Sequence, residues 1–110
     1  MNKAILIGNL VADPKQRTTQ SGTEQSSFRI AVQRRFAREG EVQADFFDVV
    51  SWGQTASFVN MYLKKGRKVA VEGRIQNRTY DAEDGSKRYV TEIVADSVEA
   101  LSRREDGGEA

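Results

Sequence analysis

Nine residues, Asp45 to Gly53, constrain the fold of this chain more than any other stretch. They read Asp-Phe-Phe-Asp-Val-Val-Ser-Trp-Gly and include the only tryptophan of the sequence. Aromatic and β-branched residues predict a β-strand, in which neighbouring side chains point to opposite faces. Phe46 and Trp52 therefore share one face, and Phe47 lies on the other. Because both faces carry rings, the strand is either buried on both sides or keeps one aromatic face for a flat ligand.

The apolar patterns on both sides of this stretch predict four more strands and one helix. The predicted strands cover residues 3–11, 26–36, 45–52, 67–80 and 87–98, and the helix covers residues 53–65, between the third and fourth strands. This order is that of the OB-fold, an all-β, five-stranded, partly open Greek-key barrel that binds oligonucleotides or oligosaccharides. We expect residues 1–101 to form this single domain and residues 102–110 to form a polar, disordered tail.

Local signals add detail to these elements. The strand over residues 3–11 is rich in Ile, Leu and Val, so we interpret it as buried, with Gly8 marking the close approach of another backbone. The polar segment 16–25 predicts a short edge strand or a loop. In the helix, Thr55 is a candidate N-cap and Lys64 lies in the last turn, where cations suit the helix dipole. We expect the helix to plug the core with its apolar stripe.

The composition limits the chemistry that the chain can perform. The sequence contains neither cysteine nor histidine. Disulfides and thiolate chemistry are therefore excluded, and the usual general base near neutral pH and the commonest metal ligand are missing. No glycine-rich phosphate loop follows a strand and opens a helix. We expect a protein that is not an enzyme, with no catalytic residue, no metal site and no cofactor.

The charges are distributed unevenly along the chain. Residues 1–80 hold 13 Lys and Arg against 7 Asp and Glu, whereas residues 81–110 hold 4 against 9. This asymmetry suggests a basic working surface, although two simply solvated halves explain it equally well. The sequence has no apolar run of membrane-spanning length, and the apolar stretch in its first seven residues is too short for a signal peptide. We therefore expect a cytoplasmic protein with no membrane partner.

Four aromatic residues stand where a flat ligand could reach them. Phe36 and Tyr80 end predicted strands beside arginines, and Phe46 and Trp52 share one strand face. An aromatic ring stacks on any base, with about 1–3 kcal/mol per base, and neighbouring cations bind the phosphates. Because a duplex hides its base faces, this arrangement selects single strands. The competing interpretation is that aromatic residues in strands belong to the core, and we expect this for Phe28, Phe47, Phe58 and Tyr62, in the core or at a subunit contact.

Motifs along the chain match a known family. In order, they are Asn-Lys-Ala-Ile-Leu-Ile-Gly-Asn-Leu at residues 2–10 followed by Asp13-Pro14, the strand at residues 45–53, residues 56–66 ending in Tyr-Leu-Lys-Lys-Gly, and Val-Ala-Val-Glu-Gly-Arg-Ile at residues 69–75. Together, over about residues 2–101, they resemble the bacterial-type single-stranded DNA-binding proteins. The resemblance implies an OB-fold, a homotetramer near the nucleoid, and sequence-independent wrapping and protection of single-stranded DNA in replication, recombination and repair.

The resemblance also assigns site residues. The four stacking positions of the family fall on Phe36, Phe46, Trp52 and Tyr80. The cations expected to contact phosphates are Lys3, Arg17, Arg34, Arg35, Lys64, Arg74, Arg78, Lys87 and Arg88. Phe and Tyr stand here at positions where Trp is frequent in the family, so we expect weaker stacking per site. Phe47 replaces a residue that is often polar and involved in subunit contact, which leaves the geometry of the tetramer open.

The last residues differ from those of full-length relatives. The sequence ends in Gly107-Gly108-Glu109-Ala110, without the acidic tip by which such relatives recruit replication and repair proteins. We therefore expect no tail-mediated recruitment. A natural short form, a phage or plasmid version and a piece of a longer protein are all compatible with this ending.

Two other functions remain open at this point. One is an OB-fold adaptor of a primosome-like assembly, which binds mainly proteins as a dimer. The other is an OB domain that binds RNA or an oligosaccharide. The presence of all four aromatic positions argues against the adaptor.

Overall fold

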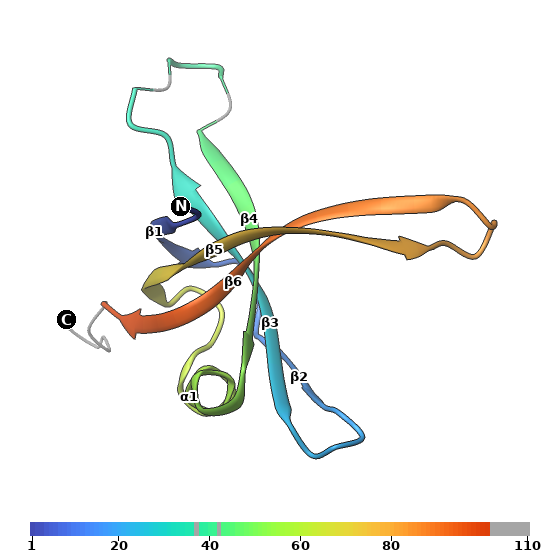
Figure 1. The fold of residues 1–110 in the computed structure, drawn as a ribbon. Helices are drawn as coiled ribbons and strands as arrows, with labels where there is room; N and C mark the ends of the chain where they lie inside the picture. The colour runs from blue at the N-terminus through green and yellow to red at the C-terminus, as the bar shows by residue number, and fades with distance from the viewer. Residues whose placement is uncertain (37, 42, 102–110) are drawn as a thin grey trace.

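The computed structural model describes residues 1–36, 38–41 and 43–101, so the predicted tail over residues 102–110 lies outside the described residues. Its elements are β1 (Ala4–Leu10), β2 (Lys15–Thr18), β3 (Glu24–Gln33), β4 (Ala44–Trp52), α1 (Gly53–Tyr62), β5 (Lys68–Asp81) and β6 (Lys87–Ala100) (Figure 1). The strands expected as third and fourth are β4 and β5, and α1 lies between them as expected. The polar segment expected as an edge strand or a loop forms the short strand β2. In this part of the chain, no helix is long and apolar enough to cross a membrane.

The six strands form one sheet that closes on itself. The strand order is β1-β5-β6-β4-β3-β2, and β1 also pairs with β3. All neighbours are antiparallel except β4 and β6, which run parallel. The sheet is therefore a ring with β2 as an edge beside β3. The predicted all-β class with one helix is confirmed.

The core fills the inside of this ring, and α1 closes one end of it. Val59 of α1 and Leu63 just after it pack in one cluster with Ile30 of β3, Val49 of β4 and Val71 of β5. Burying such a side chain stabilises the fold by about 1.5–3 kcal/mol. The predicted role of the helix as a core plug is confirmed.

The ends of α1 differ from the prediction. Trp52 is the N-cap residue and makes no side-chain capping bond, so Thr55 is not the cap. The helix ends at Tyr62, because Leu63 adopts an extended backbone (φ −104°, ψ 142°) that turns its side chain into the core. Lys64 therefore follows the helix and does not lie in its last turn.

Strand β1 is buried on one face only. Leu10 is buried, whereas Ile5 and Ile7 on the other face are exposed, so the expectation of a fully buried strand is wrong. The sequence shows the apolar residues of this strand but not what covers its outer side. The expectation for Gly8 is confirmed, since a Cβ there would lie 2.5 Å from the carbonyl oxygen of Ala31.

Strands β5 and β6 form a long hairpin that projects beyond the rest of the molecule (Figure 1). A register shift lies between Glu72 and Gly73, where the hairpin leaves the ring. A β-bulge of this kind bends the strands and increases their twist. The turn at the far end contains Gly85 with φ 88°, a left-handed conformation that favours glycine. Tyr80 and Arg88 lie near this turn as register partners.

Candidate nucleic-acid interface

One face of strand β4 continues without interruption onto β6. Val50 of β4 pairs in parallel register with Val94 of β6, and Val49 pairs with Ile93. Val49 and Ile93 belong to the core cluster, so Val50 and Val94 point away from the core. We call this side the outer face and define it on β4 by Phe46, Val50 and Trp52.

The outer face extends along the β5–β6 hairpin. Val94, Glu92, Val90 and Arg88 alternate along β6, so they share one side of that strand. Tyr80 pairs with Arg88, Arg78 with Val90 and Gln76 with Glu92, and antiparallel partners point to the same side. Tyr80 therefore lies on the same continuous sheet face as Phe46 and Trp52.

All four rings that the sequence selected are accessible to a ligand. The exposed fraction is 86% for Phe36, 55% for Phe46, 44% for Trp52 and 48% for Tyr80. Phe36 differs from the other three in its position. Strand β3 ends at Gln33 and not at residue 36, so Phe36 lies in the loop that follows. Three rings are thus held by strands, and the fourth by a loop.

The remaining aromatic residues of the prediction divide between core and surface. Phe28 is buried in the core, and Phe47 and Phe58 pack against it partly buried. Tyr62 is exposed at the end of α1 with its ring 5.5 Å from that of Phe58, so it does not lie in the core, and its predicted place at a subunit contact stays a prediction. Phe47 pairs with Ile30 in the sheet register. The two faces of β4 therefore separate its rings, with Phe47 toward the core and Phe46 and Trp52 outside.

An arginine lies against each of three rings. The guanidinium carbon is 5.9 Å from the ring centre for Arg29 at Phe46, 5.5 Å for Arg35 at Phe36, and 5.9 Å for Arg78 at Tyr80. These distances lie within the range in which a cation is attracted to an aromatic face.

Arg29 was missed by the sequence prediction. It is the register partner of Asp48 and donates a 3.1 Å hydrogen bond from Nε to that carboxylate. Asp48 shares the outer face with Phe46, and this brings Arg29 onto the same face. Alternation along β3 predicts that Arg29 lies on the strand face opposite the apolar residues. The register between β3 and β4, which the sequence does not show, brings Arg29 next to Phe46.

Most of the cations predicted to contact phosphates are paired with carboxylates. The pairs are Lys3–Glu72, Arg34–Asp45, Arg74–Asp96, Arg78–Glu92, Lys87–Asp81 and Arg88–Asp84. In the closest of the arginine pairs, Arg34 donates to both oxygens of Asp45, at 3.0 and 2.8 Å. These bonds hold the pKa of the Asp45 carboxyl below its ordinary value. Except for Arg78–Glu92, whose carboxylate is buried, these pairs are exposed on both sides. Exposed pairs contribute about 0–1 kcal/mol each, so a phosphate can compete for the cation.

The register shows which of these cations lie with the rings. Arg17 of β2 pairs with Gln25, and Gln25 pairs with Trp52, so the three form a row across the outer face. Arg74, Arg78 and Arg88 lie on the outer side of the hairpin, and Arg35 lies against Phe36. Arg34 binds Asp45, which alternates with Phe46 and therefore lies on the opposite side of β4 from the outer face. The register does not place Lys3, Lys64 and Lys87 beside the rings. Lys3 precedes β1, and Lys64 follows α1. Lys87 pairs with Asp81, the neighbour of Tyr80, and therefore lies on the other side of the hairpin from that ring.

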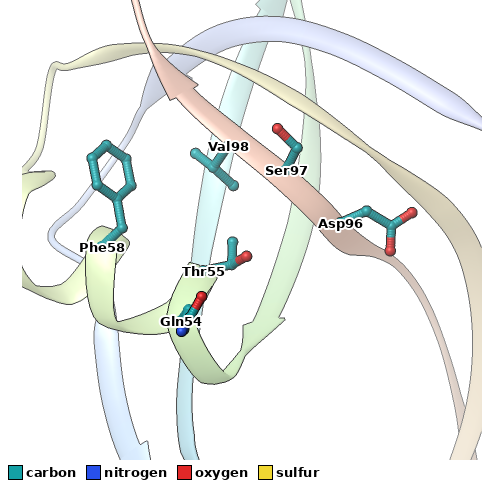
Figure 2. A pocket seen from close by; sticks show the side chains of 6 residues that line it. All are labelled: Gln54, Thr55, Phe58, Asp96, Ser97 and Val98. Carbon is teal, nitrogen blue, oxygen red and sulfur yellow. The ribbon is translucent and has the colours of Figure 1, made fainter.

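A shallow hollow of about 260 Å³ lies between α1 and β6, and none of the four rings lines it. Figure 2 shows Gln54, Thr55 and Phe58 of α1 on one side of it and Asp96, Ser97 and Val98 of β6 on the other. Its lining contains a single carboxylate, that of Asp96. Across the residues that the structure describes, no group of three or more acidic, His or Cys side chains is placed to hold a metal ion.

Comparison with known proteins identifies the family of this chain. Residues 1–101 match the single-strand binding protein family. The chain belongs to this family. Single-stranded DNA-binding protein 3 of Clostridium acetobutylicum is 51% identical over 102 residues, which are 92% of this chain and 71% of that protein. The single-stranded DNA-binding protein of Bacillus cereus is 46% identical over 110 residues, which are 99% of this chain and 65% of that protein.

Membership of the single-strand binding protein family also identifies the fold. The family implies an OB-fold, and the closed sheet of strands with one helix agrees with it. The predicted fold class and the predicted family resemblance are therefore confirmed.

Proposed function

We propose that this chain binds single-stranded DNA without sequence preference and protects it during replication, recombination and repair. One observation carries the proposal: Phe46, Trp52 and Tyr80 lie exposed on one continuous sheet face, with arginines beside them. A row of exposed rings gives successive bases a stacking surface, and the role requires no catalytic residue. Neither family membership nor the geometry favours the protein-binding adaptor.

In this proposal, base stacking and phosphate contacts both contribute to the affinity for DNA. Phe36, Phe46, Trp52 and Tyr80 stack on bases, each contributing about 1–3 kcal/mol. The cations of the outer face bind the phosphates and release counterions, which makes the affinity fall as the salt concentration rises. The predicted phosphate contacts that best fit this role are those that the register or a ring contact places with the rings: Arg17, Arg35, Arg74, Arg78 and Arg88.

A homotetramer near the nucleoid in the cytoplasm is the second part of the proposal. Ile5 and Ile7 on the outside of β1 and Met61 and Tyr62 on α1 are exposed apolar side chains that association would cover. Light scattering coupled to size-exclusion chromatography tests the assembly. The expected mass is four times the 12.3 kDa of one chain, and a monomer mass at micromolar concentration would contradict it.

The test of DNA binding uses Trp52, because the only tryptophan of the chain lies on the proposed surface. Its fluorescence is titrated with poly(dT) and with a duplex of equal length at several salt concentrations. We expect strong quenching by poly(dT), an affinity that falls with salt, and much weaker binding of the duplex. Absence of quenching, or equal affinity for both nucleic acids, would refute the proposal.

A further inference from the structure

Glu92 lies in the middle of the outer face. Within the described residues, it is the one charged residue that is buried. Its strand neighbour on the same face is Val94, which is also buried beside Val50 of β4. Removing a carboxylate from water is unfavourable unless a cation and hydrogen bonds replace the water.

Two side chains of the opposite strand supply these partners. Arg78 donates from Nε to both oxygens of Glu92, at 3.2 and 3.3 Å, and Gln76 donates from Nε2 at 3.4 Å. The side chain of Glu92 is 10% exposed, whereas that of Arg78 is 51% exposed. The guanidinium of Arg78 is therefore anchored at its buried end and open at the other.

The same guanidinium lies beside Tyr80. Its carbon lies 5.9 Å from the centre of the tyrosine ring, and both residues share the outer side of β5. Glu92, Arg78 and Tyr80 thus form a line from the buried part of the face to the exposed ring. An anchored planar cation beside a ring restricts the orientations that the ring can take.

The corresponding group at Phe46 lacks the buried anchor. Arg29 lies 5.9 Å from that ring and is bound by Asp48, but the side chain of Asp48 is 51% exposed. An exposed carboxylate exchanges its partner for water at little cost. Of the groups at Phe46 and Tyr80, only the one at Tyr80 is anchored by a buried carboxylate.

We propose that Glu92 is a positioning residue for base stacking: it anchors Arg78, and Arg78 holds the ring of Tyr80 in the orientation that a base meets. The inference rests on the proposed function. It also changes the role of Arg78, whose charge is satisfied by Glu92 before any phosphate approaches. A carboxylate in the middle of a DNA-binding face then assists binding, although its charge alone would oppose it.

A double-mutant cycle tests this inference. Glu92→Gln keeps the size of the side chain and can still accept from Gln76, but it removes the charge that anchors Arg78. We expect poly(dT) binding to weaken about fivefold, measured by quenching of Trp52, which all variants retain. In the background of Tyr80→Ala, the same change is expected to alter the affinity by less than about twofold, because the ring to be positioned is gone.

Asp96→Asn is the matched control, since it removes a carboxylate paired with Arg74, for which the structure records no ring contact. We expect it to change the affinity by less than about twofold and to show no coupling with Tyr80→Ala. If Glu92→Gln binds more tightly, Glu92 acts through its charge and the inference is wrong. An equal loss in both backgrounds would mean a structural role and would also overturn it.

A second substitution keeps the inference testable if Glu92→Gln does not fold. Arg78→Lys keeps the positive charge but loses the planar group and its Nε bonds to Glu92. If Glu92→Gln does not unfold cooperatively on heating, this variant takes its place in the cycle, with the same expected loss and the same coupling to Tyr80→Ala. Wild-type protein that shows no quenching would refute the proposed function itself, whereas normal quenching without coupling would refute only the role of Glu92.

Discussion

The side chain of Phe46 combines the properties that base stacking needs. Its ring is exposed, its backbone in β4 pairs with Ala31 of β3, and Arg29 lies against it. A ring held in a central strand loses little conformational freedom when a base stacks on it. Phe36 is more exposed but lies in a loop, so more freedom is lost when it is ordered.

Phe46→Ala is therefore expected to weaken poly(dT) binding by about 5- to 150-fold, which corresponds to the loss of one stacked base of about 1–3 kcal/mol. Fluorescence titration of Trp52 at constant salt measures the change. Tyr89→Ala is the matched control, because it also removes an exposed ring, but from the side of the β5–β6 hairpin opposite the outer face. Wild-type affinity in Phe46→Ala would show that this ring does not contact DNA.

At the scale of the elements, alternation along single strands was predictable and the pairing between strands was not. The order of residues in β4 correctly separated Phe46 and Trp52 from Phe47, because a strand alternates whatever its neighbours are. The contact of Arg29 with Phe46 depends on the register of β3 against β4, which no local pattern contains. The exposure of Ile5 likewise depends on what covers β1 and not on its own sequence.

The helix α1 was predictable from its apolar stripe, but the contact that ties it to the sheet was not. Ser57 and Asn60 of α1 donate hydrogen bonds to the carboxylate of Glu24, the first residue of β3. The residues are 33 and 36 positions from Glu24 in the sequence, so only the fold brings them together. The bond from Asn60, followed by that from Ser57, holds the pKa of the Glu24 carboxyl below its ordinary value.

This contact predicts a pH dependence of stability. A carboxyl whose pKa is lowered by folding stabilises the protein above its unfolded pKa of about 4.3, and the contribution is lost as the pH falls through the lower folded value. We expect wild type to melt at a higher temperature than Glu24→Gln at pH 7, and the difference to shrink as the pH falls below about 4.3. Calorimetry over this pH range measures it.

Glu83→Gln serves as the control, since Glu83 lies in the turn of the projecting hairpin, far from α1 (Figure 1). Its melting temperature should follow that of wild type at every pH. A difference between wild type and Glu24→Gln that is constant with pH would contradict the role of the Glu24 carboxylate.

At the scale of the whole molecule, the outer face carries acids among its cations. Arg74, Arg78 and Arg88 are each paired with a carboxylate, and their charges are partly compensated before a phosphate arrives. The formal net charge of +1 agrees with this balance. A protein of this kind gains less from counterion release than its number of arginines suggests, so stacking carries more of the affinity.

Cations without a carboxylate partner should then dominate the salt dependence. Arg17, in the row with Gln25 and Trp52, has no ion-pair partner among the residues that the structure describes. Arg17→Ala is expected to reduce the slope of log affinity against log salt by about 0.7, the value for one phosphate contact to a single strand. Arg88→Ala should reduce it by less, since Asp84 already faces this guanidinium at 3.7 Å.

The slopes are measured by poly(dT) titrations between low and moderate salt. Lys65→Ala, which removes an exposed cation just after α1, is the control and should leave the slope of wild type unchanged. Arg88→Ala tests the compensation directly. In wild type, a phosphate that binds Arg88 displaces Asp84, and the carboxylate of Asp84 is then released to water. Equal slopes for Arg17→Ala and Arg88→Ala would show that the ion pairs do not weaken the electrostatic part of binding. Phosphate contacts would then contribute more of the affinity than we expect, and base stacking less.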